Sequence, residues 1–194
     1  MGKRAHILAG ALVAAALLLS GCATGTDAAS DTTEASVQGL IEAHGLSGMD
    51  AVEMIDHLDR VPLEERPTDL IASVTPEQLI LVSETEETAL DLPEDAFYLS
   101  IAPFVNHTHE CHFHSLTTCV GELSDQEVDV KITDDAGQVL VEAQRTTFDN
   151  GFVGVWVPTG TQGTIEISYD GMTGSTQYST NEDSATCITD LQLS

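Results

Sequence analysis

The stretch Glu127-Val128-Asp129-Val130-Lys131-Ile132-Thr133 alternates strictly between polar and apolar side chains. A period of two is typical of a β-strand that has one face buried and the other face in water. The next four residues, Asp134-Asp135-Ala136-Gly137, are typical of a turn, and residues 138–144 supply a second strand. The stretch therefore predicts an antiparallel hairpin.

Further runs of strand-forming residues lie on both sides of this hairpin, and turns at Asp149-Asn150-Gly151 and Asp170-Gly171 separate some of them. Short strands at such regular spacing are typical of a β-sandwich or a small barrel. The runs that we expect to form strands are 78–83, 97–105, 152–157, 164–169, 175–179 and 186–193.

Residues 37–60 instead predict two short amphipathic helices, separated by the glycine-containing stretch 45–48. In the second helix Val52, Ile55 and Leu58 recur at spacings of three, which indicates a buried stripe, and Met54 can join its edge. The fold class that follows is α+β: a short N-terminal helical segment followed by a mostly antiparallel β-sandwich-like domain. We expect the helical region with the first strands to span residues 37–95 and the β-rich domain to span residues 96–194.

The N-terminus is typical of an export signal, because two basic residues precede an apolar run at 7–19. A membrane-spanning helix needs about 20 apolar residues, so this run is too short to cross a bilayer in the mature protein. The run ends in Leu19-Ser20-Gly21-Cys22, which resembles the lipobox of bacterial lipoproteins. We therefore expect residues 1–21 to be a lipoprotein-type signal peptide, Cys22 to carry lipid, and residues 22–36 to be a flexible tether.

This reading predicts an exported protein, lipid-anchored on the outer face of the cytoplasmic membrane or in the periplasm. An ordinary secretory signal, with Cys22 near the cut by coincidence, is the alternative. The chain carries 32 acidic residues against 6 Lys and Arg, for a net charge of −26. Nucleic-acid binding is excluded because it depends on Lys and Arg displacing counterions, and we expect membrane contact through the lipid anchor only.

The cysteines cannot all pair within one chain. If Cys22 carries lipid, Cys111, Cys119 and Cys187 remain in a compartment that oxidises thiols. Either one thiol stays free or the sulfur atoms have another partner.

Two of these cysteines lie in residues 107–119, which read HTHECHFHSLTTC and hold four of the seven histidines. Thiolate and imidazole are soft to borderline ligands that suit Cu(I) or zinc. Structural zinc sites pair cysteines two to four residues apart, whereas seven residues separate Cys111 from Cys119. The spacing therefore favours copper, as Cu(I), over zinc.

Alternation along an extended chain limits which of these side chains can meet. His107, His109 and Cys111 would share one side, and His112 and His114 the other. A bulge or a turn near Cys111 would be needed to gather both sets around one ion.

Residues 108–123 resemble the CueP family of periplasmic copper-binding proteins, whose pattern is T-H-x-C-x-F-H-S-L-T-T-C-x-G-E-L. A third family cysteine lies close to the C-terminus, where this chain has Cys187. The likeness extends from about residue 37 to the end and includes residues 97–103 and 149–152. It implies copper binding through Cys111, Cys119 and Cys187, with His109 and His114 as the matching histidines.

The same resemblance implies thiol-linked reduction of Cu(II) and transfer of copper to a periplasmic superoxide dismutase. In that scheme Cys111 and Cys119 form the redox pair and Cys187 anchors the metal, and a thiol-disulfide reductant is a further expected partner. Two other histidines depart from the family pattern: we interpret His107 as a bystander and leave His112 as a possible extra ligand.

Three other functions remain open. In the first, a disulfide between Cys111 and Cys119 has the purely structural role of stabilising a nine-residue loop. A thiol-disulfide oxidoreductase of the cell envelope without a metal role is the main alternative, although the chain lacks the C-x-x-C spacing that lowers a thiol pKa in such enzymes. A cell-surface binding module with an incidental disulfide is the third.

Overall fold

The structure is a computed structural model and describes residues 37–194. The predicted signal peptide, the lipidation site at Cys22 and the tether lie outside these residues. No helix within residues 37–194 is long and apolar enough to span a membrane.

The helical segment consists of residues 37–43 and of α2, Ala51–Leu58. Asp50 and Glu53 form a capping box at the start of α2, in which each side chain accepts the backbone N–H of the other residue. The buried face comprises Ala51, Met54, Ile55 and Leu58, and Val52 is only half-buried. The structure thus confirms Met54, Ile55 and Leu58 as buried, but Ala51 takes the place predicted for Val52, because the buried positions follow the i, i+3, i+4, i+7 pattern of a helix that packs across a sheet.

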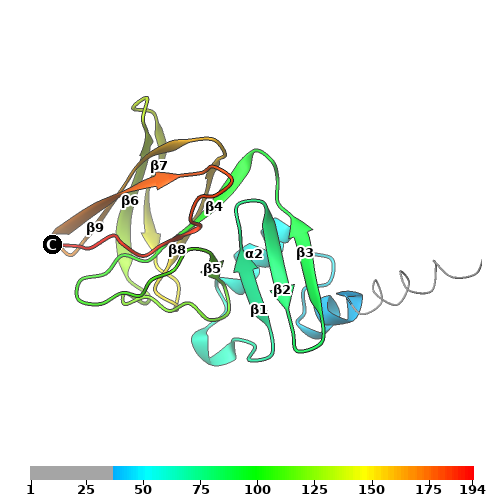
Figure 1. The fold of residues 1–194 in the computed structure, drawn as a ribbon. Coiled ribbons are helices and arrows are strands. Elements are labelled where there is room, and N and C mark those ends of the chain that lie inside the picture. The colour runs from blue at the N-terminus through cyan, green and yellow to red at the C-terminus, as the bar shows by residue number, and fades with distance from the viewer. Residues whose placement is uncertain (1–36) are drawn as a thin grey trace, which may run out of the picture.

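Helix α2 packs on a four-stranded sheet with the order β3-β2-β1-β5 (Figure 1). Its strands are β1 (Ile71–Val74), β2 (Gln78–Val82), β3 (Glu87–Asp91) and β5 (His114–Ser115), and the short 3-10 helix η1 (Leu63–Glu65) precedes them. The sequence predicted only β2 among these strands. The edge strand β3 is acidic and has no buried residue, so it lacks the apolar alternation that identifies a strand.

The second half of the chain forms two further sheets that face each other. The first has the order β10-β9-β6-β7, and the second has the order β11-β4-β8. The bounds are β4 Ala96–Ile101, β6 Glu127–Asp134, β7 Val139–Thr146, β8 Val153–Pro158, β9 Gln162–Tyr169, β10 Met172–Ser179 and β11 Cys187–Ile188. The predicted hairpin is present as β6 and β7, and the mostly antiparallel, sandwich-like arrangement agrees with the expected fold class.

Strand β4 joins the two halves because both of its faces are buried. Phe97, Leu99 and Ile101 enter the core between the two facing sheets, whereas Tyr98 points into the core beneath α2. In Figure 1 β4 accordingly runs between the β1–β3 side and the β6–β9 side of the molecule. The strand stops at Ile101 and not at the predicted Val105, because Pro103 has no N–H to continue the ladder.

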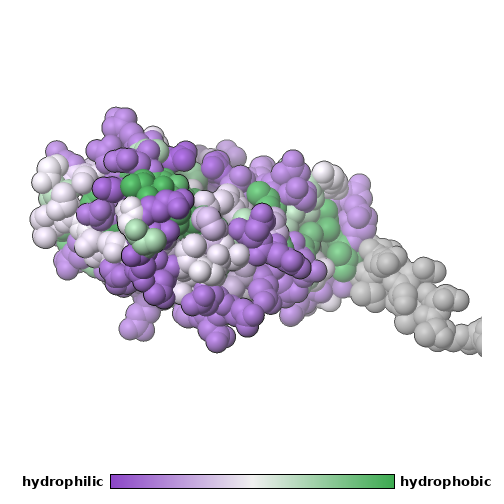
Figure 2. Space-filling model, turned by 90° about the horizontal axis from the view of Figure 1, so that it is seen from above, coloured by the Kyte–Doolittle hydropathy of each residue, from purple (hydrophilic) through white to green (hydrophobic). Residues whose placement is uncertain are grey.

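The C-terminal strand differs from the expectation for 186–193, since β11 holds only Cys187 and Ile188 and pairs with β4 in parallel. An isolated bridge between Phe104 and Gln192 continues this alignment further along the chain. The parallel pairing sets Cys187 opposite Ser100, near the end of β4. Hydrophilic side chains cover most of the face seen in Figure 2, as the acidic composition requires.

Candidate metal centre

The histidine- and cysteine-rich loop is held between β1 and β11. Its residue His114 pairs with Val74 of β1, and the carbonyl of His112 accepts the backbone N–H groups of Thr186 and Cys187 at 3.0 and 3.1 Å. The N–H of His114 donates to the hydroxyl of Thr186 at 3.0 Å. These contacts bring Cys187, which is remote in sequence, beside the loop.

Cys119 reaches the same place through a tight turn and a buried anchor. Its N–H donates to the carbonyl of Ser115 at 3.1 Å, and its own carbonyl accepts Nη1 of Arg66 at 2.8 Å. Leu116, within the turn, is fully buried in the core beneath α2. The loop thus has its turn anchored in one core, while Cys187 belongs to the sheet of the other.

Four ligand atoms meet at this junction. One ligand atom each from His109, Cys111, Cys119 and Cys187 lies within 4.8 Å of every other. A disulfide joins Cys111 to Cys187, and Cys119 is free, with its Sγ 3.6 Å from Sγ of Cys111. The third sulfur therefore lies with the other two, as a shared site requires.

The chemistry of these donors fits a soft metal ion. Nε2 of His109 is buried and makes no hydrogen bond to any residue in 37–194, so its side chain has an unused donor or acceptor at the site. Phe152 lies against the ring of His109, with the ring centroids 6.2 Å apart. A cluster of three sulfurs and an imidazole nitrogen without a hydrogen-bond partner is the kind of donor set that Cu(I) or zinc binds.

His114 is fully buried and lies just outside the group of four. Its Nδ1 is 3.8 Å from Sγ of Cys187, and its Nε2 is 2.9 Å from Oδ1 of Asp59. Burial alone would lower the pKa of His114, but the negative charge and hydrogen bond of Asp59, with a smaller effect of Cys119, raise it to about 9. Burial in turn opposes ionisation of Asp59, yet His114 and the hydroxyl of Tyr98 hold the pKa of that carboxyl below its ordinary value.

Cys119 has an acidic thiol. Burial would raise its pKa, but the hydrogen bond and charge of His114 and the backbone N–H of Ser115 lower the pKa to about 7. A large share of Cys119 is therefore thiolate near neutral pH, which is the form that binds metal and attacks disulfides.

The remaining histidines of the segment lie at the surface. The ring of His112 is exposed and packs on Phe113, with centroids 4.6 Å apart. The ring of His107 is also exposed, and its Nδ1 lies 3.5 Å from Glu122. No regular strand spans 107–113, so the alternation expected for an extended chain does not apply there. A loop, and not a strand, is what gathers the donors.

Glu122 fixes the entry to this loop. Its carboxylate accepts the backbone N–H groups of Val105 and Asn106 at 2.7 and 2.9 Å, and the side-chain amide of Asn106 at 2.8 Å. Although its desolvation acts in the opposite direction, these hydrogen bonds lower the pKa of Glu122 to about 2. The carboxylate therefore stays ionised and hydrogen-bonded to residues 105–107 over the whole physiological pH range.

Sequence reasoning missed Asp59 and Glu122. Asp59 is one of 32 acidic residues, and nothing in its neighbourhood distinguishes it, because its partner His114 is 55 positions away. Glu122 lies inside the motif at 108–123, so its place beside the cysteines was the one available signal.

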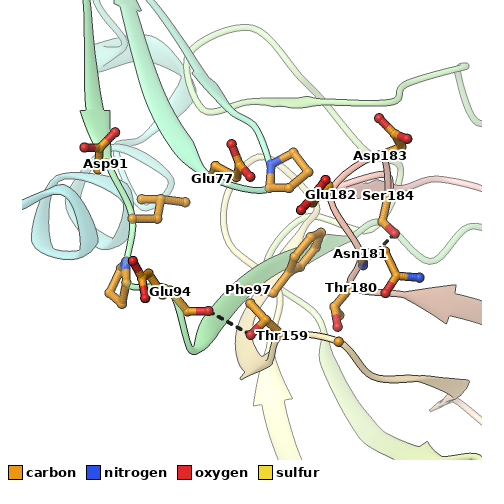
Figure 3. A pocket seen from close by; sticks show the side chains of 14 residues that line it. Glu77, Asp91, Glu94, Phe97, Thr159, Thr180, Asn181, Glu182, Asp183 and Ser184 are labelled. Carbon is orange, nitrogen blue, oxygen red and sulfur yellow. Dashed lines mark hydrogen bonds between the residues drawn. The ribbon is translucent and has the colours of Figure 1, made fainter.

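A separate hollow of about 1030 Å³ lies beyond the start of β4, away from the sulfur atoms (Figure 3). Its lining includes five carboxylates and no cysteine or histidine among the described residues. Such hard oxygen donors do not select a soft ion. The carboxylates lining the hollow are Glu77, Asp91, Glu94, Glu182 and Asp183.

Comparison with known proteins agrees with this site. Residues 53–192 match the family model described as periplasmic copper-binding protein CueP. The chain belongs to the CueP family. Its fold is also similar to a crystal structure of S.CueP, with 39% sequence identity and a TM-score of 0.78, over 82% of this chain and 98% of that chain. No curated protein sequence matches the chain significantly.

The family assignment made from residues 108–123 is thus confirmed. The matched residues include Asp59, most of α2 and Cys187, so the CueP similarity covers both parts of the chain that meet at the site. The CueP motif accounts for Cys111 and Cys119, and the parallel pairing of β11 explains how a cysteine near the C-terminus joins them.

Proposed function

We propose that this protein binds copper as Cu(I) outside the cytoplasm, with Cys111, Cys119 and Cys187 as thiolate ligands and His109 as the fourth donor. The observation that carries the proposal is the convergence of these four ligand atoms within 4.8 Å. Membership of a family of periplasmic copper-binding proteins supports the choice of metal.

Zinc is the less favoured ion, although three thiolates and one imidazole also form zinc sites. In this structure two of the three sulfurs are joined in a disulfide. A site whose ligands interconvert between thiols and a disulfide suits a metal that itself changes oxidation state, and zinc has no redox chemistry.

The redox step that we propose oxidises two thiols and reduces copper. Two thiolates form one disulfide and release two electrons, which reduce two Cu(II) ions to two Cu(I) ions. The redox pair expected from the sequence is Cys111 and Cys119, and it stays a prediction; the pair Cys111 and Cys187 is the one oxidised here. Before all three sulfurs can bind one Cu(I), a thiol reductant must supply two electrons to reopen the disulfide.

His114 has a different role in this proposal from the one that the family motif implied. Its Nδ1 faces Cys187, but its other nitrogen is engaged by Asp59 and its ring is held in the core. We propose that it supports the sulfur ligands and joins the metal only if the site tightens on loading. The exposed ring of His112 makes it a weaker candidate for a ligand.

Export, the lipid anchor at Cys22 and the copper recipient are further parts of the proposal. A tethered copper protein would hand its ion to a partner in the same compartment, for which a copper-dependent superoxide dismutase is our candidate. Mass spectrometry of the exported protein tests the anchor: a diacylglycerol-modified Cys22 is expected, and an unmodified residue there would refute it.

Titration of the fully reduced protein with Cu(I), against a chromogenic Cu(I) chelator, tests the binding site. Replacing Cys111, Cys119 and Cys187 together by Ser should abolish competition with the chelator. The matched control is His107→Ala, which removes an exposed histidine of the same loop and should leave the affinity unchanged. An affinity that survives the triple substitution would refute the proposed ligands.

A thiol-disulfide oxidoreductase remains the second candidate, and one observation favours it. Cys119 combines a pKa of about 7 with a position 3.6 Å from a disulfide sulfur. Metal-free protein that reduces insulin at the expense of a thiol cosubstrate would support this function. Protein that binds Cu(I) and leaves insulin oxidised would refute it.

A further inference from the structure

A buried polar network connects the end of α2 to the sulfur site. Asp59 is fully buried, and its carboxylate accepts hydrogen bonds from Nε2 of His114 at 2.9 Å, the hydroxyl of Tyr98 at 2.6 Å and Nδ2 of Asn150 at 2.7 Å. Three donors around one carboxylate leave it no freedom to rotate. The binding of copper by the sulfurs does not by itself require any of these four side chains.

The network determines which edge of the His114 ring faces the sulfurs. Because Nε2–H donates to Asp59, Nδ1 is the nitrogen that points toward Sγ of Cys187, 3.8 Å away. Phe152 packs against the ring with centroids 4.5 Å apart, and Thr186 binds the backbone N–H of the same histidine. The orientation of the His114 ring is therefore fixed by the hydrogen bond at its edge, by packing against its face and by the hydrogen bond of its backbone N–H.

The sulfurs are arranged around Cys111. Its Sγ is bonded to Cys187 and lies 3.6 Å from the free Sγ of Cys119. Cys119 is half-buried and accepts the N–H of Ser115 at 3.4 Å, which orients the sulfur toward the site. A free sulfur already in contact with a disulfide sulfur is the arrangement from which thiol-disulfide exchange starts.

We propose that the three cysteines exchange their disulfide internally, and that Asp59 is a positioning residue for this exchange because it holds His114 beside the departing sulfur of Cys187. Cys119 enters as a thiolate and forms a bond to Sγ of Cys111. The bond from Cys111 to Cys187 breaks, and its electron pair leaves on Sγ of Cys187 as a thiolate. One bond replaces another and one thiolate replaces another, so the step needs no oxidant, reductant or proton.

Exchange has a consequence for the site, because it changes which sulfur is free. With Cys111 bonded to Cys187, the free sulfur is the half-buried Cys119; after exchange it is Cys187, which is only 2% exposed. The two oxidised forms thus offer an incoming reductant or ion either an accessible sulfur or a shielded one. This activity goes beyond copper binding and does not depend on it.

The experiment maps the free thiol in metal-free, oxidised protein. The full chain carrying Cys22→Ser, so that no fourth sulfur takes part, is kept at pH 8 without added thiol and then quenched with acid to stop exchange. Denaturation, alkylation and peptide mass spectrometry report the fraction of molecules in which each cysteine is free. We expect free thiol at both Cys119 and Cys187, in a ratio that does not depend on protein concentration.

Two substitutions at one position separate positioning from packing. In His114→Gln the side-chain amide takes the place of Nε2, so a donor for Asp59 is kept but the polar group at the Nδ1 position is lost. In His114→Asn the shorter side chain puts its amide near the Nδ1 position instead. His114 interacts with both sulfurs, but Cys119 is half-buried and also accepts the N–H of Ser115, whereas Cys187 is only 2% exposed, so the loss of the histidine falls mainly on Cys187. His114→Gln should therefore lower the ratio of free Cys187 to free Cys119 about tenfold, as expected for loss of one hydrogen bond to a charged group. His114→Asn should restore part of that ratio, and Asp59→Asn should resemble His114→Gln.

Several results would overturn the proposal. Free thiol confined to Cys119 in the unsubstituted site would show that exchange does not occur. Free thiol at Cys111, or a Cys187 fraction that rises with protein concentration, would assign the exchange to another sulfur or to another molecule. A ratio unchanged in His114→Gln would remove the role of the histidine. If Asp59→Asn does not fold, Tyr98→Phe can replace it, because it removes one hydrogen bond to the same carboxylate. Tyr98→Phe should also lower the ratio of free Cys187 to free Cys119. An unchanged ratio would overturn the role of Asp59.

The control is the other histidine-aspartate pair of the described chain, His44 and Asp69, whose Nε2 and Oδ1 are 4.0 Å apart. His44 makes no contact with the sulfur site. His44→Gln should leave the ratio of free cysteines as it is, and a change as large as that of His114→Gln would show that the effect is global.

Discussion

Replacing Asp59 by Asn should destabilise the protein strongly, because it removes the charge that a buried imidazole depends on. Both side chains of the Asp59–His114 pair are completely buried, so water cannot take over the lost interaction. The amide also presents an NH₂ group to a site where Nε2 of His114, Asn150 and Tyr98 all donate. At least one of these donors then loses its acceptor.

The loss of stability in Asp59→Asn can be worked out from the burial of the pair and from the pKa of His114. Breaking a buried ion pair by removing one partner costs about 3–5 kcal/mol. The rise in the pKa of His114 from 6.5 to about 9 corresponds to about 3 kcal/mol of preferential binding of the proton in the folded state. Both routes lead to a loss of about 3 kcal/mol in the free energy of unfolding at pH 6.

Urea denaturation at pH 6, with the disulfide intact, measures this loss through the transition midpoint and its slope. Asp69→Asn is the matched control, because Asp69 lies 4.0 Å from His44 but its side chain is 73% exposed. An exposed pair of this kind contributes about 0–1 kcal/mol. A loss below about 1 kcal/mol for Asp59→Asn, or an equal loss for both variants, would refute the reasoning.

The pH dependence gives the same prediction a second test. The pKa of His114 is raised in the folded state, so its stabilising contribution is complete below pH 6.5 and is lost as the pH rises through about 9. The pKa of Asp59 is lowered, so its contribution is present above its ordinary value of 3.8 and is lost as the pH falls below it. With Cys119→Ser as the background, so that no thiol titrates in the same range, stability should fall between pH 6.5 and 9, and Asp59→Asn should flatten this fall.

Two further predictions concern the neighbours of this network. The rate at which iodoacetamide alkylates Cys119 should rise with a midpoint near pH 7, below the ordinary value of 9.0, and His114→Gln should move the midpoint upward; equal midpoints would contradict the interaction. Gly154→Ala should destabilise the protein by about 1–3 kcal/mol in urea denaturation, since its Cβ would collide with the hydroxyl of Tyr98 and push it away from Asp59. Combining it with Tyr98→Phe should cost less than the sum of the two changes, and full additivity would argue against that mechanism.

The sequence determined those parts of the protein whose causes are local. Alternation at 127–133 was enough to predict the β6–β7 hairpin, because consecutive side chains of a strand point to opposite faces and the sequence shows this period directly. The crowding of cysteine and histidine in 107–119, with a motif match that added Cys187, was enough to identify the family and to predict a metal site in this loop. The edge strand β3 escaped detection because none of its residues is fully buried and Leu90 is its only large apolar side chain, so it leaves too weak a pattern.

The tertiary structure decided which side chains meet. Cys187 lies beside Cys111 because two residues of β11 pair in parallel with β4, a contact too short to leave a periodic signal. Asp59 reaches His114 across 55 positions because α2 and the loop share one core, and only that burial turns an ordinary aspartate into the partner of a histidine with a raised pKa. Long-range contacts of this kind depend on how whole elements pack, and no single stretch of sequence carries that information.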